Sequence, residues 1–436
     1  MDSISNSEGM NGMKHQLTTF PNGLRVLSFP MAGRESVSLG VWVACGGRYE
    51  NIAKAGLSHF IEHMVFKGTK RFTGLQIKKA IEGAGGHLNA FTAEEFTCYL
   101  AKVTPRHLGR ALEVLSEMVV SPTLTSKDFE KEKPVIIEEI KLYLDLPGSH
   151  VIDILFSLLW PNQSLGMFLA GTPQTVSDIT HGELKKFKET HYASSNVCVV
   201  ACGNVSHQQL IKAVKSGFKE LKTEKKNTFK KASAGGQKKA QVKILEKKLE
   251  QTHLAIGFRA SGRRSQKRFP ESILNIILGA NMSSRLFQEV REKRSLAYEI
   301  GSHIKRYDEV GALIIDAGMD NNKREEVLRV ILGELKKLTK KGPSPNELKR
   351  AKEFFRGQFM LSLEGTTERM IWLGENLTTL NKVEDEQAIL RKIDSVSFQD
   401  VKNTAAQIFK NDNLNLSVIG PLKTNEQKKI KECLKI

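Results

Sequence analysis

The sequence Gly56-Leu-Ser-His-Phe-Ile-Glu-His-Met-Val-Phe-Lys-Gly-Thr69 carries two histidines and a glutamate within one short apolar stretch. Read as a helix, it places His59 and His63 four residues apart, so both imidazoles leave the same face one turn apart. Two histidines at this spacing can bind one zinc ion. Glu62 directly precedes His63, so its carboxylate lies beside the pair and can deprotonate a water molecule there. The stretch therefore predicts a helix that carries part of a metal site.

The order of these residues, H-x-x-E-H, is the inverse of the H-E-x-x-H signature of zinc metalloproteases and is known as the inverzincin motif. The alternative interpretation is an amphipathic helix with two incidental histidines, because five-residue motifs also occur by chance. A comparison of the two halves of the chain helps to decide between the two.

The second half of the chain repeats the pattern of the first half. Matched positions recur at offsets of 215 to 219 residues: Leu39 with Leu254, Val41 with Ile256, Asp128 with Glu347, Asn196 with Asn413, and Gly203 with Gly420. A repeat of this length indicates an internal duplication. The sequence therefore predicts an α+β fold with two similar α/β-sandwich domains, each a mainly antiparallel sheet with helices packed on it.

The duplication also tests the motif. At an offset of 215, the two histidines and the glutamate fall opposite three apolar residues, Leu274, Ile277 and Leu278. A helix needed only for packing could be apolar in both copies. The polar triple in the first copy therefore has a role beyond packing, which favours the metal site.

The predicted domain boundaries follow from composition and from the repeat. Residues 1–15 are polar and are expected to be mobile. Residues 16–222 form the N-terminal domain with the metal site, and residues 240–436 form the homologous domain without one. The segment 223–239 between them is basic and rich in small residues, as expected of a linker.

Length, composition and net charge limit the class of protein. With 436 residues, 40% hydrophobic and 26% charged, the chain is typical of a globular protein of two to four domains. No run of 18 apolar residues and no secretory signal pattern occur, so we expect a cytoplasmic protein without a membrane span. The net charge of +18 comes from scattered lysines without an aromatic stacking motif, so no nucleic-acid partner is expected.

The five cysteines form no C-x-x-C pair. Cys198 and Cys202 lie four residues apart in a strand-like run, so both side chains face the same buried side. We interpret them as core thiols in a reducing compartment rather than as metal ligands.

A catalytic zinc site usually takes three protein ligands, so one more donor is required. The helix expected from Ser126 to about Leu144 offers four glutamates: Glu130, Glu132, Glu138 and Glu139. Two of them, Glu132 and Glu139, are seven residues apart and therefore share one helix face. Spacing alone does not choose among the four, and a solvated helix face is the alternative for each.

With these residues in hand, the chain resembles the pitrilysin-type family of zinc metallopeptidases. It is most similar to the branch with the β subunit of mitochondrial processing peptidase and its bacterial relatives. The resemblance runs from about residue 16 to about residue 422. It is carried by the stretch quoted first, by Gly85-Gly-His-Leu-Asn-Ala-Phe-Thr92, and by Glu130-Lys-Glu-Lys-Pro-Val-Ile-Ile-Glu-Glu-Ile140.

The resemblance implies a role for each of the residues singled out so far. It makes His59, His63 and Glu139 the ligands of one zinc ion per chain, and it makes Glu62 the general base. It makes Glu132 the carboxylate that hydrogen-bonds a ligating histidine. The implied activity is hydrolysis of peptide bonds in short unfolded peptides or presequence-like segments.

The resemblance also implies residues that contact the substrate. Asn89 and Ala90 fall where the family pairs an edge strand with the peptide backbone. Arg291 and Tyr298 fall where the family's arginine and tyrosine reach the substrate from the second half, so they are expected to assist catalysis. Without the resemblance, both would be interpreted as ordinary surface residues.

Four such domains enclose a chamber in this family, so a chain with two domains is expected to form a homodimer. The alternative function is a catalytically silent structural or regulatory subunit of a processing-peptidase-like complex. The intact H-x-x-E-H motif argues against that alternative, because silent subunits typically lose those residues.

Overall fold

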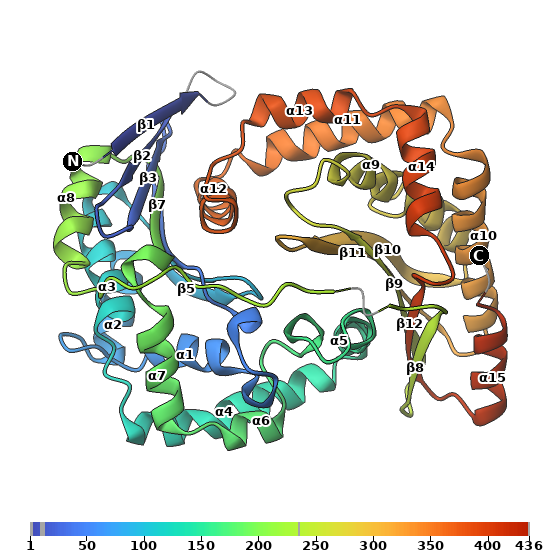
Figure 1. Ribbon diagram of the computed structural model, residues 1–436, viewed down its shortest axis with the longest axis horizontal. Helices are drawn as coiled ribbons and strands as arrows, with labels where there is room; N and C mark the ends of the chain where they lie inside the picture. Colours follow the sequence, from blue (N-terminus) through green and yellow to red (C-terminus); the bar gives the residue numbers. More distant parts are fainter. Residues whose placement is uncertain (1–2, 9–13, 234–235, 435–436) are drawn as a thin grey trace. The chain divides into compact units, whose positions relative to one another are not determined.

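The computed structural model describes residues 3–8, 14–233 and 236–434. The chain divides into two compact units (Figure 1). The first unit comprises residues 1–140, 168–230 and 360–389, and the second unit comprises residues 141–167, 231–359 and 390–436. Each unit is built from one sheet and the helices that pack on it.

The first unit contains a seven-stranded sheet in the order β1-β2-β3-β7-β4-β6-β5. The strands are β1 Ser3–Glu8, β2 Lys14–Thr19, β3 Arg25–Pro30, β4 Val37–Val43, β5 His87–Thr92, β6 Thr97–Val103 and β7 Val197–Gly203. Strands β3 and β7 are parallel, and the other neighbouring pairs are antiparallel. The turn between β2 and β3 contains Asn22 and Gly23, and Gly23 has a φ of 85°, which suits glycine.

Part of the segment 1–15, for which the sequence predicts mobility, belongs to the sheet. Residues Ser3–Glu8 form β1, which pairs antiparallel with β2 from Ser3 opposite Thr19 to Glu8 opposite Lys14. Backbone hydrogen bonds at a sheet edge do not require apolar side chains, so a polar segment can extend the sheet. Residues 1–2 and 9–13 of the expected segment lie outside the described residues.

Helices cover both faces of this sheet. They are α1 Leu57–Val65, α2 Gly74–Ile81, α3 Leu108–Val120, α6 Pro173–Asp178, α7 His181–His191, α8 His207–Gly217 and α12 Thr366–Leu380, together with α4 Ser126–Leu144, whose last turn belongs to the second unit. Helix α12 packs on β4 and β7, with Met370 and Leu373 against the buried ring of Trp42. A Cβ atom on Gly374 would lie only 2.1 Å from that ring, so this close approach requires glycine.

The second unit contains a five-stranded sheet in the order β10-β11-β9-β12-β8. The strands are β8 Gln241–Glu246, β9 Gln251–Ser261, β10 Ala297–Arg306, β11 Val310–Asp320 and β12 Asn415–Gly420. The helices are α5 Pro147–Leu159, α9 Arg268–Leu278, α10 Arg324–Lys341, α11 Pro345–Ser362, α14 Phe398–Ile408 and α15 Thr424–Glu432, and α13 Glu386–Asp394 crosses the boundary between the units. Leu155, Leu159 and Trp160 of the α5 region pack against Ala255 and Ile314 of the sheet.

The two sheets share one topology, which confirms the predicted pair of similar α+β domains. The order β8-β12-β9-β11-β10 repeats the order β3-β7-β4-β6-β5, including a single parallel pair at the same place. Helix α9 occupies the position of α1 in the repeat, and its Leu274, Ile277 and Leu278 are buried. Helix α9, the apolar counterpart of the helix with the two histidines, therefore serves packing.

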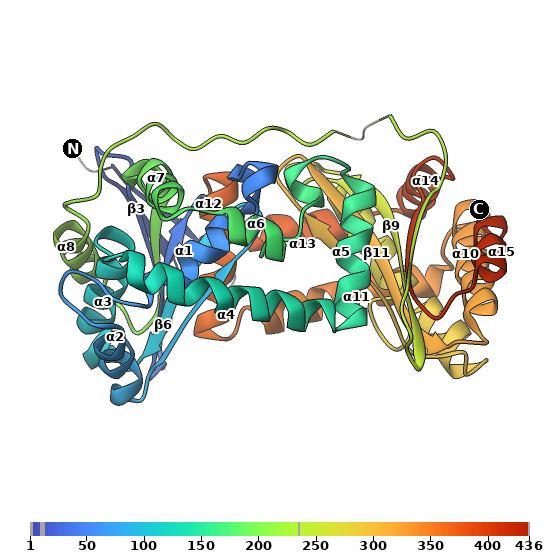
Figure 2. The same ribbon diagram turned by 90° about the horizontal axis from the view of Figure 1, so that it is seen from below.

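The units are not contiguous halves of the chain. Helix α5 comes from the first half of the sequence but packs on β9 and β12 of the second unit, whereas α12 comes from the second half but packs on the first unit (Figure 2). The two helices begin 219 residues apart, at Pro147 and Thr366, so they are equivalent elements of the repeat. The units therefore differ from the expected domains 16–222 and 240–436 by an exchange of matching helices.

The segment 223–239 forms neither helix nor strand in its described residues. Its residues 223–230 belong to the first unit, and its residues from 231 onward belong to the second unit. The backbone N–H of Asn227 donates to Asn196 Oδ1, and its side chain donates to the carbonyl oxygen of Ala44.

Two further observations concern the whole described chain. No single helix in the described ranges is long and apolar enough to cross a membrane, although α4 and α5 taken together reach that length and composition. All five cysteines are free thiols, and Cys198 and Cys202 are buried as predicted.

Candidate metal centre

Helix α1 forms because one side of it is apolar and buried. Phe60, Ile61, Met64 and Val65 are fully buried. The ring of Phe60 stacks on that of Phe129 in α4, with centroids 4.7 Å apart and planes 6° apart. This contact fixes α1 against α4, and it leaves the two histidines of α1 half-buried on the remaining face.

Helix α4 has a matching arrangement. Phe129, Ile136 and Ile140 are buried, and the side chains of Glu132 and Glu139 turn toward α1, with 7% and 30% of their surface exposed. Both glutamates lie on the helix face that the seven-residue spacing predicts.

The structure brings three of the predicted residues together. One donor atom each from His59, His63 and Glu139 lies within 4.8 Å of the other two. His63 Nε2 is 3.3 Å from Glu139 Oε2, and His59 Nε2 is 3.8 Å from Glu139 Oε1. All three residues belong to the first unit. Two imidazole nitrogens and one carboxylate oxygen form the His₂Glu donor set of several catalytic zinc sites.

The other ring nitrogens test whether the residues fit a metal ion. His63 Nδ1 lies 2.9 Å from Glu132 Oε1, and the second oxygen of Glu132 is paired with Lys67. This bond leaves Nε2 of His63 for a ligand, as in carboxylate–histidine–zinc arrangements. His59 Nδ1 is buried and has no hydrogen-bond partner among the described residues. The donor set fits zinc with three protein ligands and one further position.

The electrostatics of the cluster keep His59 neutral and Glu132 ionised. Burial lowers the pKa of His59 to about 4, and the neighbouring His63 adds to this effect, so His59 is neutral at pH 7. Burial also acts to raise the pKa of Glu132, but hydrogen bonds with His63 and Lys67 outweigh it and hold the pKa below its usual value. Glu132 is therefore a carboxylate that can accept from His63.

The pKa of His63 is shifted in the opposite direction from that of His59. Burial acts to lower its pKa, but the hydrogen bond with Glu132 and the charges of Glu139, Glu132 and Glu62 outweigh burial, so the pKa is raised. In the absence of a metal ion these carboxylates therefore favour a proton on His63. The same negative charges favour a divalent cation at this position.

Glu62 lies beside the cluster in a different environment. One of its carboxylate oxygens accepts a hydrogen bond from the hydroxyl of Thr92, at the end of β5. Burial raises its pKa, although the bond from Thr92 and the charge of His63 oppose this. A carboxylate with a raised pKa is suited to accept and return a proton near neutral pH. Sequence reasoning did not single out Thr92, although it is the last residue of the stretch Gly85–Thr92.

Asn89 and Ala90 lie in β5, which is the last strand in the sheet order. Its partner on the inner side is β6, with Asn89 opposite Leu100 and Ala90 opposite Tyr99. An edge strand presents backbone N–H and C=O groups that can pair with another extended chain. The same strand therefore carries an open edge and the hydroxyl that holds Glu62.

Arg291 and Tyr298 are brought together in the second unit. The guanidinium carbon of Arg291 lies 4.9 Å from the ring centroid of Tyr298 and 4.8 Å from that of Phe287. Arg291 lies in a π-helix, η7 Phe287–Glu292, and Ser295 after it has a φ of 48°. A β-bulge between Ala297 and Glu299 leaves Tyr298 with 71% of its surface exposed. Such irregularities often mark functional segments.

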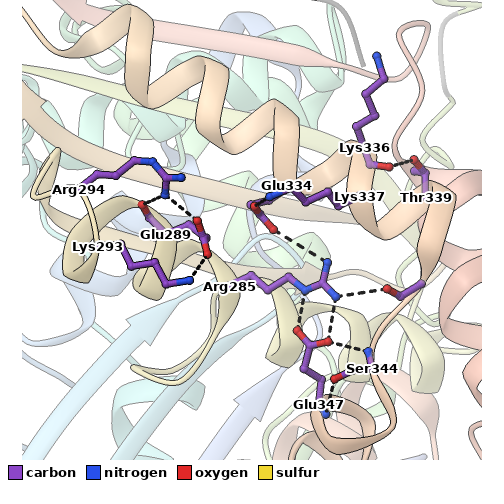
Figure 3. Close-up of polar contacts among 11 residues, drawn as sticks. Arg285, Glu289, Lys293, Arg294, Glu334, Lys336, Lys337, Thr339, Ser344 and Glu347 are labelled. Atoms are coloured by element: carbon purple, nitrogen blue, oxygen red, sulfur yellow. Dashed lines mark hydrogen bonds and ion pairs between the residues drawn. The ribbon is translucent and has the colours of Figure 1, made fainter.

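A charged network holds the start of this segment to two helices. Figure 3 shows Arg285 between Glu334 of α10 and Glu347 of α11. Arg285 Nε and Nη2 lie 2.6 and 2.8 Å from the two oxygens of Glu347, and Nη1 lies 4.0 Å from Glu334. Although burial acts to raise the pKa of Glu347, the hydrogen bond from Arg285 outweighs it and lowers the pKa to about 2. The bidentate pair fixes the turn that leads into η7.

The start of α1 is held by an upstream residue that sequence reasoning missed. Glu50 accepts hydrogen bonds from the backbone N–H groups of Gly56 and Ser58. Burial raises the pKa of Glu50 to about 7, and those hydrogen bonds oppose the rise. A glycine at the N-cap position is a signal in the sequence, because it requires an acceptor from elsewhere.

Two family models match the chain. Residues 25–173 match the model described as "Insulinase (Peptidase family M16)", and residues 178–355 match "Peptidase M16 inactive domain". The metal cluster lies in the first of these ranges, and the apolar copy of its helix lies in the second.

Curated relatives match over nearly the whole chain. "Uncharacterized zinc protease YmxG" of Bacillus subtilis is 35% identical over 92% of this chain and 97% of that relative. An uncharacterized zinc protease of Streptomyces coelicolor is 32% identical over 96% of this chain and 92% of that relative.

Solved structures share the fold. A protease from Helicobacter pylori superposes with a TM-score of 0.89 at 24% identity, covering 94% of this chain and all (100%) of that one. A peptidase M16 inactive domain from Pseudomonas fluorescens superposes with a TM-score of 0.86 at 19% identity, covering 97% of this chain and 98% of that one.

Proposed function

Because the chain belongs to peptidase family M16, we propose that it is a zinc-dependent endopeptidase that binds one zinc ion. The observation that carries this proposal is the convergence of donor atoms from His59, His63 and Glu139 within 4.8 Å. The names of the relatives support the metal, and the donor set supports it independently.

The two histidines would hold the ion through Nε2, and Glu139 through a carboxylate oxygen. When bound, zinc polarises the scissile carbonyl and lowers the pKa of a coordinated water toward ~7. Glu132 and Lys67 keep the ring of His63 in one orientation, because the carboxylate is bonded to both of them. The chain therefore supplies a positioned set of ligands before any substrate arrives.

Glu62 performs the proton transfers. Its carboxylate, held by the hydroxyl of Thr92, accepts a proton from the attacking water as the water oxygen bonds to the peptide carbon. Glu62 then donates that proton to the peptide nitrogen as the carbon–nitrogen bond breaks. The products are a carboxylic acid and an amine, and no covalent intermediate with the enzyme is required.

The edge of β5 supports a preference for unfolded peptides. A substrate that pairs with Asn89 and Ala90 as an added strand must be extended and must have free backbone groups. Folded proteins lack such segments at their surfaces, apart from exposed edge strands. We therefore propose short unfolded peptides or presequence-like segments as the substrate class.

The direct test uses the full chain and metal exchange. After removal of metal with a chelator, we expect no cleavage of an unstructured peptide with a fluorophore and a quencher at its ends. Addition of zinc to one equivalent restores cleavage. A protein that takes up zinc and cleaves no peptide would instead support the silent-subunit alternative.

We further propose that Arg291 and Tyr298 contact the substrate during hydrolysis. The exposed hydroxyl of Tyr298 is suited to donate to the carbonyl oxygen as negative charge develops on it. The stacked guanidinium of Arg291 limits the directions in which the phenol ring can turn.

Tyr298→Phe therefore lowers kcat about ten- to hundredfold, the range for one hydrogen bond to a charged group. The steady-state rate on the quenched peptide measures this effect. Zinc affinity is the control and remains at the wild-type value, because the donor set lies in the other unit. An unchanged kcat would exclude the hydroxyl from the reaction.

We also propose that two copies of the chain associate. The support is that one chain holds two of the four domains that the family resemblance requires for a chamber, and that it carries both the metal cluster and the Arg291–Tyr298 pair.

A further inference from the structure

Helix α1 begins without a capping side chain of its own. Gly56 occupies the N-cap position with a φ of 105°, and no side chain caps the helix from there. A Cβ atom at this position would come within 2.6 Å of the carbonyl oxygen of Ala170. Both facts require glycine, so the residues that usually cap helices, such as Ser, Thr, Asp and Asn, are excluded.

Glu50 supplies the missing acceptors from six residues upstream. Its Oε2 accepts the backbone N–H of Gly56 at 2.7 Å, and its Oε1 accepts that of Ser58 at 2.6 Å. A carboxylate at a helix N-terminus also interacts favourably with the helix dipole. Both oxygens of Glu50 are thus used to fix the first turn of α1.

The first turn carries His59, which follows Ser58 directly. A ligating histidine usually donates its second ring nitrogen to a carboxylate or carbonyl, which sets the orientation of the ring. His63 has such a partner in Glu132, whereas His59 Nδ1 is buried with no hydrogen-bond partner in the described part of the chain. The orientation of His59 therefore depends on its backbone and on packing.

We propose that Glu50 is a positioning residue for the metal site, which orients His59 through the backbone of α1 as Glu132 orients His63 through its side chain. The inference rests on the proposed function, because it assumes that α1 binds zinc. Glu50 acts through the helix and not as a ligand.

The test compares zinc affinity in two capping variants of the full chain. Glu50→Ala removes both acceptors. We expect the zinc dissociation constant to rise about tenfold or more, within the range for partners of ligating histidines. Thr73→Ala is the matched control, because Thr73 caps α2 in the same unit through the N–H of Gln76. Each variant lowers Tm by about 2–4 °C, but only Glu50→Ala weakens zinc binding. Competition with a chromogenic chelator measures the dissociation constant without any substrate.

Glu50→Gln keeps one acceptor oxygen, so its zinc affinity lies between those of the wild type and Glu50→Ala. If Glu50→Ala does not fold, the comparison of Glu50→Gln with Thr73→Ala decides the matter. Glu50 variants that bind zinc as tightly as Thr73→Ala would overturn the proposal.

Failure of the proposed function would look different. If the wild-type chain binds zinc and cleaves no peptide, the peptidase proposal is wrong, but the effect of Glu50 on zinc affinity can still be measured. A wild-type chain that binds no zinc overturns both.

Discussion

Glu62→Gln lowers kcat for peptide hydrolysis about 10²- to 10⁴-fold, the usual contribution of a general base. Glutamine has nearly the shape of glutamate and can still accept the hydrogen bond from Thr92. It cannot accept a proton from water, so the nucleophile is not activated. Because Glu62 is outside the donor cluster of His59, His63 and Glu139, zinc affinity stays close to the wild-type value.

Two measurements on the same preparation check this result. Zinc content after dialysis against a weak chelator gives the occupancy, and initial rates on the quenched peptide give kcat. Glu130→Gln is the matched control, because Glu130 is an exposed glutamate of α4 and is expected to keep full activity. Hydrolysis by Glu62→Gln at the wild-type rate would assign the base to another residue.

Glu139→Ala abolishes tight zinc binding, and activity with it. Removal of one of three donors leaves only the two imidazoles of α1, so we expect the dissociation constant to rise more than about 100-fold, beyond the cost of losing a partner of a ligand. The fold persists, because Glu139 keeps 30% of its side-chain surface exposed, and substitutions at partly exposed positions usually change stability little.

Variants of the neighbouring glutamates show whether the loss of zinc binding is specific to Glu139. Glu138→Ala changes an exposed residue one position away and leaves zinc binding intact. Glu132→Gln removes the charge beside His63 Nδ1 and weakens zinc about 10- to 100-fold, less than Glu139→Ala. An affinity in Glu139→Ala equal to that in Glu138→Ala would contradict the proposed donor set.

Much of the metal site was predictable because it depends on helical spacing. The positions of His59 and His63 on one face follow from the helix period alone, and so does the shared face of Glu132 and Glu139. Which of these two glutamates approaches the Nε2 atoms of the histidines, and which bonds Nδ1 of His63, does not follow from spacing. That depends on how α1 lies on α4, which the stacking of Phe60 on Phe129 determines.

The parts that could not be predicted depend on local departures from regular structure. The exposure of Tyr298 requires a β-bulge, and the approach of Arg291 to its ring follows a π-helical turn. Neither irregularity has a periodic signal in the sequence. The roles of Glu50 and Thr92 were missed for a related reason, because each acts through one or two hydrogen bonds whose partners no periodic pattern predicts.

The repeat predicted two similar domains, and the sheets confirm them, but the period carried no information about the partners of α5 and α12. Because α5 and α12 are equivalent helices of the repeat, their sequence pattern is the same whether each packs on its own sheet or on the other one. Only the buried contacts, such as those of Met370 with Trp42, reveal it.

The exchange has a consequence for how the gene product can be divided. Expression of either half alone would leave its sheet without the helix that seals one face, since that helix is encoded on the far side of the 223–239 segment. A large apolar surface would then meet water and promote aggregation. The duplicated halves are therefore expected to fold only as parts of one translation product.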